Sequence, residues 1–352
     1  MRVLYRADGG HPIGTGHVYR AERLLRQMLR TPGVEACVLT AEEPATERIL
    51  EGLPARVERL PPRTDRVAVK PRLQADPVLE RLAREAWDLI VVDMLDTPAE
   101  DMRRLREVGI PIATFDDRGP GRVFADTIVN VLVTEPEPVR LPAGTRLLEG
   151  GPYVTLDRPY RDAGRRYSPR RFDTMRRVFV AMGGADAAGL TVNVARALTL
   201  VPAVERVEFA CGPAFPHRAD LDVVLEGAPW GHTVRIGLPS LIEPLLAADL
   251  AIVAGGLTMY EACCVGAPAL AVCQPIDHQL ELSERLAAAG AMATVGYGLE
   301  ANDELIAHAV GELARDPDRR RALSVRGPAL VDGRGTERTA TALMETTRRG
   351  DP

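Results

Sequence analysis

The sequence is poor in aromatic residues and has no large excess of charge of either sign. Phenylalanine, tyrosine and tryptophan make up 4% of the 352 residues, and the formal net charge is −5 at pH 7. Proteins that bind single strands stack bases on aromatic rings, and proteins that bind a phosphate backbone need a basic surface. We therefore expect no nucleic-acid partner. A local anion site built from backbone N–H groups is compatible with this charge.

Long apolar runs and paired cysteine motifs are also missing. No apolar run approaches the roughly 20 residues that span a bilayer, and residues 1–8 read as a strand rather than a signal peptide. The cysteines are odd in number, lack a C-x-x-C pair and lie mostly in apolar segments, which favours reduced core residues. We expect no transmembrane segment, a cytoplasmic location, no metal and no cofactor. The sequence does not predict the oligomeric state.

What the sequence does contain is a regular alternation of short apolar runs with amphipathic stretches. In the first half the expected strands are residues 2–7, 36–40, 89–93, 112–115 and 127–131, with helices at 19–29 and 98–108. In the second half they are residues 178–182, 207–211, 234–236, 250–253 and 269–273, with helices at 190–198, 240–247, 258–265, 278–289 and 303–315. This pattern predicts an α/β fold with parallel sheets covered by helices.

The two halves are separated by a stretch rich in glycine, proline and arginine between residues 150 and 171. Such composition is typical of a linker. We expect an N-terminal Rossmann-like domain over 1–155, a linker over 156–175, a second Rossmann-like domain over 176–334 and a C-terminal helix over 335–352. A single large doubly wound sheet is the alternative.

The first glycine loop runs from Gly9 to His17, and its Gly14 and Gly16 are candidate substrate-binding residues. It follows an expected strand and opens an expected helix, whose N-terminus favours the neutral form of an imidazole. His17 is therefore the candidate catalytic base. Asp8 is the second catalytic candidate, because its carboxylate is placed to orient His17 or a substrate hydroxyl. The alternative is that His17 only packs or caps at the helix start. The loop matches neither a G-x-G-x-x-G fingerprint nor a P-loop.

Three further loops follow strands of the second half. Backbone N–H groups in the first two suit phosphate oxygens, and a carboxylate such as Glu261 suits ribose hydroxyls. Thr258 and Glu261 also fit a capping box, and Asp277 fits a helix N-cap, so purely structural roles are the alternatives. The candidate binding residues in these loops are Gly183, Gly184, Asp186, Gly255, Gly256, Leu257, Thr258, Glu261, Asp277 and Gln279.

Asp116 and Asp117 form a carboxylate pair at the end of an expected strand. Such a pair can bind a metal or serve as acid and base. A turn or cap role is favoured here, because aspartate is common in turns.

Several of these segments resemble one enzyme family in the same order along the chain. The matching residues are Arg6-Ala7-Asp8, Ile13-Gly14-Thr15-Gly16-His17-Val18 with Arg20, Val91-Val92-Asp93, Phe115-Asp116-Asp117, Ala181-Met182-Gly183-Gly184-Ala185-Asp186, Ala254-Gly255-Gly256 with Thr258 and Glu261, and Asp332-Gly333-Arg334-Gly335. The pattern is similar to the PseG hydrolases of pseudaminic acid synthesis and their SpsG relatives in spore coat polysaccharide synthesis. Some of it is shared with glycosyltransferases of the MurG type.

The resemblance implies a GT-B architecture, in which two Rossmann-like domains have parallel sheets facing a central cleft. It also implies metal-independent release of UDP from an amino-deoxy sugar by water that attacks the anomeric carbon. By resemblance, His17 is the base. The residues expected to contact UDP are Gly255, Gly256, Thr258 and Glu261, and Arg20 and Asp93 are also expected to bind substrate. The expected partner is thus a small nucleotide sugar.

The chain departs from the family at one strand end, where Asp93-Met94-Leu95 replaces the usual Asp-His-Tyr of the sugar side. An inverting glycosyltransferase, in which His17 deprotonates an acceptor hydroxyl, is therefore the second hypothesis. A non-catalytic nucleotide-binding protein is the third.

Overall fold

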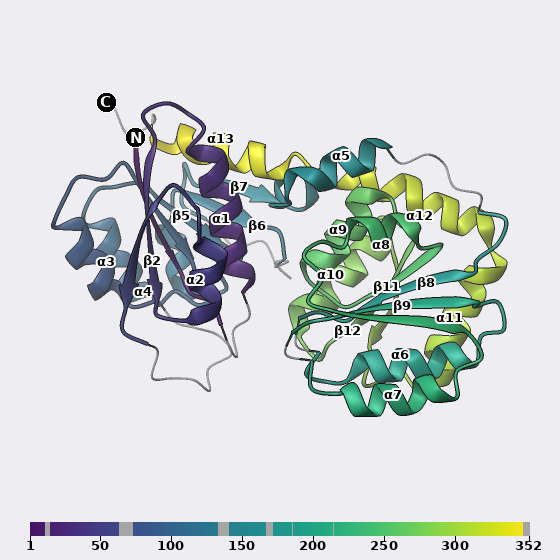
Figure 1. Cartoon of the computed structure of the whole chain (residues 1–352). Helices are drawn as coiled ribbons and strands as arrows, with labels where there is room; N and C mark the ends of the chain where they lie inside the picture. Colours follow the sequence, from purple (N-terminus) through teal and green to yellow (C-terminus); the bar gives the residue numbers. More distant parts are fainter. Residues whose placement is uncertain are drawn as a thin grey trace. The chain divides into compact units, whose positions relative to one another are not determined.

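The structure is a computed structural model of the 352-residue chain, and it describes residues 1–10, 15–62, 73–132, 141–166, 172–184, 186–213 and 215–347. The chain forms two compact units (Figure 1). Unit 1 comprises Met1–Asp157 together with Arg334–Pro352, and unit 2 comprises Arg158–Gly333. The segment expected as a linker thus contributes most of its residues to unit 2, and the C-terminal helix belongs to unit 1.

In the described part of unit 1, seven parallel strands form one sheet in the order β3-β2-β1-β4-β5-β6-β7. The strands are β1 (Arg2–Ala7), β2 (Glu35–Ala41), β3 (Arg56–Leu60), β4 (Leu89–Asp93), β5 (Ile112–Phe115), β6 (Thr127–Asn130) and β7 (Arg146–Glu149). The apolar runs of β1, β4 and β5 are buried on both faces, as expected for central strands of a parallel sheet.

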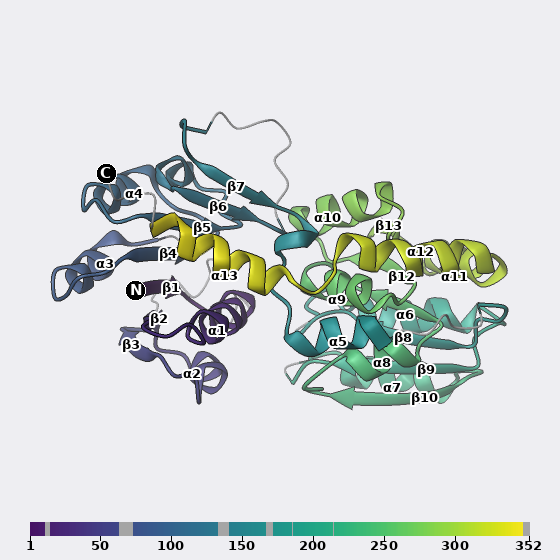
Figure 2. The ribbon, with the colours of Figure 1, turned by 90° about the horizontal axis from the view of Figure 1, so that it is seen from above.

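Helices cover both faces of this sheet. One face carries α1 (Gly16–Met28), flanked by α2 (Pro44–Leu50) and α13 (Gly335–Thr346). Figures 1 and 2 show α13 beside α1. The opposite face carries α3 (Ala75–Leu82) and α4 (Ala99–Arg106), whose apolar side chains pack with Leu4, Ile90 and Val92. Two short 3₁₀ turns, Pro120–Phe124 and Gly151–Tyr153, complete the unit.

Side-chain hydrogen bonds fix α13 to unit 1. The hydroxyl of Thr336 donates to the carbonyl of Leu156 at 2.7 Å, and the hydroxyl of Thr339 donates to the carbonyl of Tyr153 at 3.0 Å. At the other end of the helix, the hydroxyls of Thr346 and Thr127 lie 2.9 Å apart. The last helix in the sequence is therefore an integral part of the first unit.

In the described part of unit 2, six parallel strands form a sheet in the order β10-β9-β8-β11-β12-β13. The strands are β8 (Arg177–Ala181), β9 (Arg206–Cys211), β10 (Gly231–Ile236), β11 (Leu250–Val253), β12 (Ala269–Cys273) and β13 (Ala293–Tyr297). In each sheet the first strand of the unit, β1 or β8, lies inside the sheet. The next two strands lie on one side of it and the later strands on the other, so the two units repeat one topology.

The helices of unit 2 also lie on both faces of the sheet. Side chains of α6 (Leu190–Thr199), α7 (Arg218–Glu226) and α11 (Asp303–Arg315) join one apolar core with the sheet. The remaining helices are α8 (Ile242–Ala247), α9 (Leu257–Val265), α10 (Asp277–Ala288), α12 (Pro317–Leu330) and α5 (Arg158–Arg166). Helices α5, α8 and α12 pack against α9, so α5 is a packed element of this unit.

The predicted α/β class and all the predicted strands are confirmed, and the single-sheet alternative is wrong. The sequence patterns missed β3, β7 and β13 and the first half of β10. These strands lie at or near sheet edges and are partly exposed, so their sequences lack a continuous apolar run. Helices α2, α3, α5, α7 and α12 were missed as well. Among the described residues, no helix is both long enough and apolar enough to cross a membrane.

Candidate functional site

The carboxyl ends of β1, β4 and β5 bring three side chains to the face of the sheet that α1 covers. Side chains alternate along a strand, so Tyr5, Asp93 and Phe115 point away from the core formed with α3 and α4. The parallel register pairs Ala7 with Asp93, which sets Asp93 at the end of the sheet. Ligands of open α/β sheets bind beyond such strand ends.

His17 lies at the start of α1 and contacts this strand end. Helix α1 begins at Gly16, so the predicted position of His17 at the helix N-terminus is confirmed. Its Nδ1 is 2.6 Å from Oδ1 of Asp93. A carboxylate only accepts, so we assign the Nδ1 hydrogen to this bond, which makes Nε2 the unprotonated nitrogen. Among the described residues, Nε2 has no hydrogen-bond partner, and His17 is 8% exposed.

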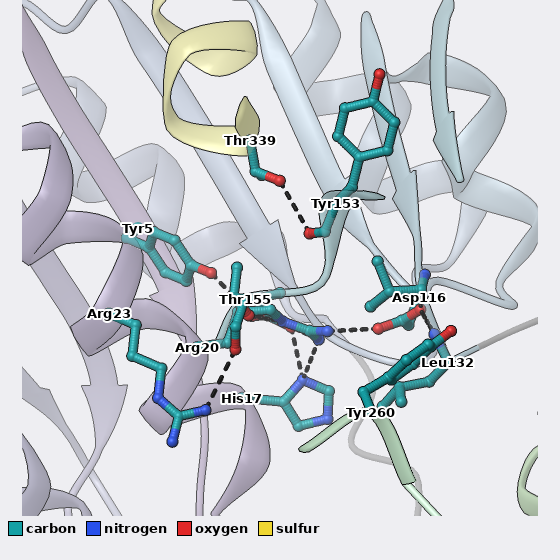
Figure 3. A network of polar contacts seen from close by, with 12 residues as sticks. Tyr5, His17, Arg20, Arg23, Asp116, Leu132, Tyr153, Thr155, Tyr260 and Thr339 are labelled. Carbon is teal, nitrogen blue, oxygen red and sulfur yellow. Dashed lines mark hydrogen bonds and ion pairs between the residues drawn. The ribbon is translucent and has the colours of Figure 1, made fainter. Parts of the chain in front are cut away.

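Arg20 lies one turn further along α1 and contacts the same carboxylate. Its Nε donates to Oδ2 of Asp93 at 2.8 Å, and one terminal nitrogen donates to Oδ1 at 2.6 Å. The hydroxyl of Tyr5 donates to Oδ2 at 2.8 Å. Asp93 is fully buried, and its carboxylate accepts from the side chains of His17, Arg20 and Tyr5. Figure 3 shows the side chains of Tyr5, His17 and Arg20 close together.

Asp116 holds the second terminal nitrogen of Arg20. It follows β5 in a left-handed backbone conformation with φ of 47°. Its other carboxylate oxygen accepts from the backbone N–H groups of Val131 and Leu132, each at 2.7 Å. The plane of Arg20 lies over the ring of Phe115, with the guanidinium carbon 4.9 Å from the ring centroid. Figure 3 shows Arg20, Asp116 and Leu132 in this arrangement.

The charges of this cluster stabilise one another. Burial by itself raises the pKa of Asp93, but Arg20 and then His17 outweigh it and hold the pKa of this carboxyl well below its usual range. Burial lowers the pKa of Arg20, but Asp93 and Asp116 raise it above its ordinary value. Burial and then Asp93 raise the pKa of Tyr5 well above 10.0, so the phenol keeps its proton. Asp93 is ionised under all ordinary conditions.

Asp8, the other catalytic candidate, contacts an arginine. The two terminal nitrogens of Arg6 donate to its two carboxylate oxygens, at 2.5 and 2.7 Å, and the backbone N–H of Ala41 donates at 2.8 Å. The carboxylate that the structure pairs with His17 is that of Asp93, which the sequence analysis assigned to substrate binding. Alternation explains the difference, because Asp8 shares its side of β1 with Arg6 rather than with Tyr5.

Asp117 has the turn role that the sequence analysis favoured. Its carboxylate accepts from the backbone N–H of Gly119 at 2.8 Å and from the hydroxyl and backbone N–H of Thr97 at 2.5 and 3.2 Å. Burial raises the pKa of Asp117 to about 7, against the lowering effect of these bonds. Among the described residues, no group of three or more His, Cys, Asp or Glu side chains is arranged to hold a metal ion.

Met94, where the chain departs from the family pattern, lies in the core. It is 1% exposed and packs with Ile90, Val92 and Met102 on the face that α3 and α4 cover. The strand alternation that directs Asp93 to α1 directs Met94 to the opposite face. The histidine-to-methionine difference therefore falls on a packing position.

In unit 2, the turn after β8 starts α6. The carboxylate of Asp186 accepts from the backbone N–H groups of Leu190 at 2.9 Å and Thr191 at 2.8 Å, so it satisfies the first turn of α6. The side-chain amide of Gln274 donates to the same carboxylate at 2.7 Å. Gly183 and Gly184 precede Asp186 in the turn, and both are exposed to solvent.

The turn after β11 is fixed by a glutamine. The side-chain oxygen of Gln279 accepts from the backbone N–H groups of Gly255 at 3.0 Å and Gln274 at 3.2 Å. A Cβ atom on Gly255 would meet the Gln279 side chain at 2.2 Å, so only glycine fits there. Through Gln274, the predicted residues Asp186, Gly255 and Gln279 belong to one hydrogen-bonded group, and Gln274 is a member that the sequence analysis missed.

Gly256 precedes α9 with φ of 93° and ψ of −150°, a conformation essentially restricted to glycine. Helix α9 begins at Leu257, and its N-cap has no side-chain hydrogen bond. The capping-box interpretation of Thr258 is therefore wrong, because Thr258 is the second helical residue. Its predicted partner Glu261 is buried on the same helix. The N-cap position of α9 is therefore a glycine, which has no side chain that could cap the first turn.

Two other predicted residues lie at the start of helices. Asp277 is the first residue of α10 and not its N-cap, and its carboxylate accepts from the hydroxyl of Tyr297 at 3.0 Å. Gly16 is the first residue of α1. Gly14 lies outside the described residues.

Comparison with known proteins finds similarity along the whole chain. The chain is 28% identical over 351 residues to the spore coat polysaccharide biosynthesis protein SpsG of Bacillus subtilis, with 98% of each protein covered. No protein-family model matches the chain.

Solved structures agree on the fold. MurG of Acinetobacter baumannii superposes with a TM-score of 0.71 at 16% identity, over 98% of this chain and 99% of that one. The spinosyn rhamnosyltransferase SpnG, solved with thymidine diphosphate, gives a TM-score of 0.64 at 19% identity, over 99% and 100% of the two chains. The predicted GT-B fold is confirmed.

Proposed function

The chain is a homologue of SpsG with the GT-B fold, and from this premise we propose that it is a nucleotide-sugar hydrolase. It releases UDP from a UDP-activated amino or deoxy sugar by attack of water at the anomeric carbon. The reaction serves polysaccharide or nonulosonic acid synthesis in the cytoplasm. The link to polysaccharide synthesis rests on the name of the similar protein SpsG. The binding of a nucleoside diphosphate is supported by SpnG, which was solved with thymidine diphosphate.

The observation that carries this proposal is the bond between His17 Nδ1 and the buried carboxylate of Asp93, 2.6 Å long. An ionised carboxylate fixes the tautomer and the orientation of an imidazole and stabilises the imidazolium that forms when the ring takes a proton. Nε2 is then the basic atom. This is the geometry that a general base requires.

We assign the nucleotide to unit 2. The first turn of α9, whose N-cap is Gly256, supplies backbone N–H groups and the positive end of a helix to the diphosphate. Thr258 donates a hydroxyl to a phosphate oxygen, and Glu261 accepts from the ribose hydroxyls. Gly183, Gly184, Asp277 and Gln279 border the same strand ends and complete the binding set.

In the proposed reaction, the oxygen of water forms a bond with the anomeric carbon while the bond from that carbon to the diphosphate breaks. His17 Nε2 takes the proton of water, and the electron pair of the broken bond leaves with UDP. The helix N-terminus stabilises the charge that grows on UDP. Attack from the face opposite to the leaving group inverts the configuration at the anomeric carbon.

An inverting glycosyltransferase is the second candidate, because SpnG has the same fold and is named a rhamnosyltransferase. His17 would then take its proton from an acceptor hydroxyl instead of water. The same base and the same nucleotide site serve both reactions, so the acceptor distinguishes them.

The test is a phosphorus NMR screen of UDP-, GDP-, CMP- and dTDP-sugars with the purified protein, with and without a mixture of sugar acceptors. The hydrolase proposal predicts UDP release from a UDP-sugar without acceptor. It also predicts that the sugar first released is the inverted anomer, which proton NMR detects. Release that requires an acceptor would establish the transferase instead. No turnover of any donor, together with no UDP binding by calorimetry, would leave a non-catalytic protein.

A further inference from the structure

Arg20 was expected to bind substrate, yet its guanidinium lies inside unit 1. The residue is 3% exposed, and three of its nitrogens donate to carboxylates: Nε and one terminal nitrogen to Asp93, and the other terminal nitrogen to Asp116. One face of the guanidinium is covered by the ring of Phe115. A substrate would have to displace buried charge pairs to reach it.

We propose that Arg20, held by Asp116, is a positioning residue that fixes the carboxylate of Asp93 and thereby the tautomer of His17. The inference deepens the proposed function and rests on it for its catalytic consequence. It adds a role that neither the sequence pattern nor the similar proteins assign.

The geometry of the contacts supports this role. Asp93 Oδ1 faces both His17 Nδ1 and a terminal nitrogen of Arg20, at 2.6 Å each, while Oδ2 faces Arg20 Nε and the Tyr5 hydroxyl, at 2.8 Å each. The side-on contact through two nitrogens fixes the plane of the carboxylate as well as its position. His17 can therefore donate to it in one orientation.

Asp116 binds the terminal nitrogen of Arg20 that does not contact Asp93. Its left-handed backbone and its two bonds from Val131 and Leu132 anchor the carboxylate to the end of β6. Arg20 thus lies between two fixed anions. Without the guanidinium, Asp93 would be a buried carboxylate with only neutral or weakly basic partners, a setting in which burial favours the protonated acid. A protonated Asp93 no longer selects the Nδ1–H tautomer.

The first test reads the tautomer directly and needs no substrate. In nitrogen-15 NMR, the ring signals of His17 are identified by their loss in His17→Asn. We expect the wild type to show a protonated Nδ1 and an unprotonated Nε2. Arg20→Met is expected to give a mixture of tautomers, and Arg20→Lys, which restores the charge but not the side-on contact, a smaller shift toward the mixture.

The second test uses kinetics on the substrate that the donor screen identifies. Arg20→Met should lower kcat on the order of 100-fold, the scale of a misplaced catalytic group, and leave KM nearly unchanged. Arg23→Met is the matched control, because Arg23 lies on the same helix and pairs with the half-exposed Asp157 at 2.8 Å. It should keep the wild-type tautomer and kcat.

A raised KM with a wild-type kcat and a single tautomer in Arg20→Met would overturn the proposal and return Arg20 to substrate binding. If circular dichroism shows that Arg20→Met does not fold, Asp116→Asn takes its place, since it keeps Arg20 and removes the anion that holds it. A folded Asp116→Asn protein with the wild-type tautomer would equally refute the proposal. If the wild type turns over no nucleotide sugar, the proposed function fails, and the tautomer measurement still decides the role of Arg20.

Discussion

The two units repeat one strand topology but finish their strands with different chemistry. In unit 1, the central strand ends carry buried charged side chains, with Asp93, Arg20 and Asp116 in direct contact. In unit 2, the corresponding ends carry glycine turns, and the backbone N–H of Gly255 in one of them donates to the side-chain oxygen of Gln279. The buried carboxylate there, Asp186, satisfies the start of α6.

The difference shows that one scaffold can present either side-chain or main-chain chemistry at the same edge of the sheet. Side-chain groups have pKa values that their neighbours adjust, so they suit proton transfer. Main-chain N–H groups carry no titratable proton and suit the binding of an anion at constant strength. We therefore assign the proton transfer to unit 1 and the diphosphate to unit 2.

The largest effect is expected from His17→Asn. Loss of a general base lowers the rate by about 100- to 10,000-fold, while the substitution leaves the proposed nucleotide site of unit 2 unchanged. We expect turnover to fall by this factor and the affinity for UDP, measured by calorimetry, to stay at the wild-type value. Equal losses of turnover and of UDP affinity would show that the two units do not divide the work in this way.

The next effect is on stability and compares one buried aspartate from each unit. Asp93→Asn removes the anion that Arg20 and His17 share, and breaking a buried ion pair costs on the order of 3 kcal/mol. Asp186→Asn weakens the start of one helix, which costs about 1 kcal/mol. Urea denaturation measures both free energies of unfolding. A smaller loss for Asp93→Asn than for Asp186→Asn would contradict the contrast between the units.

A third prediction concerns the main-chain site. Gly256 has φ of 93° and ψ of −150°, so Gly256→Ala strains the backbone by about 1–3 kcal/mol or shifts the first turn of α9. We expect weaker UDP binding by calorimetry and an unchanged His17 tautomer by NMR. Gly52→Ala is the control, because Gly52 also has positive φ, at 71°, but lies on a surface turn of unit 1. Undiminished UDP affinity in Gly256→Ala would remove α9 from the proposed nucleotide site.

Features within one strand or loop were predictable from the sequence, and partnerships between distant segments were not. The glycine loops and the placement of His17 follow from local patterns. The bond between His17 and Asp93 joins positions 76 residues apart, whereas the partner that the sequence offered for His17 was Asp8, at the end of the strand just before the glycine loop. Strand alternation was the overlooked signal, since it separates Asp8 from Tyr5 and Met94 from Asp93. The spacing of Arg20 three residues after His17 also predicts one shared helix face.

The smallest expected effect compares two carboxylates within unit 1. Burial raises the pKa of Asp117 to about 7, whereas Arg20 and His17 hold the pKa of Asp93 well below its usual range despite burial. The folded protein therefore keeps a proton on Asp117 that the unfolded chain releases near pH 4. Because the folded state binds more protons between about pH 4 and pH 7, Asp117 makes stability fall as the pH rises through this window.

Asp93 has the opposite effect on the pH dependence of stability, in a different pH range. Its folded pKa is depressed, so its contribution is present above about pH 4 and is lost as the pH falls below that value. Urea denaturation of Asp117→Asn at several pH values separates the two. The variant should lose the downward slope between about pH 4 and pH 7 and keep the loss of stability in more acidic solution. A slope that survives the substitution would assign it to another group and leave Asp117 ionised in its turn, held by Thr97 and Gly119.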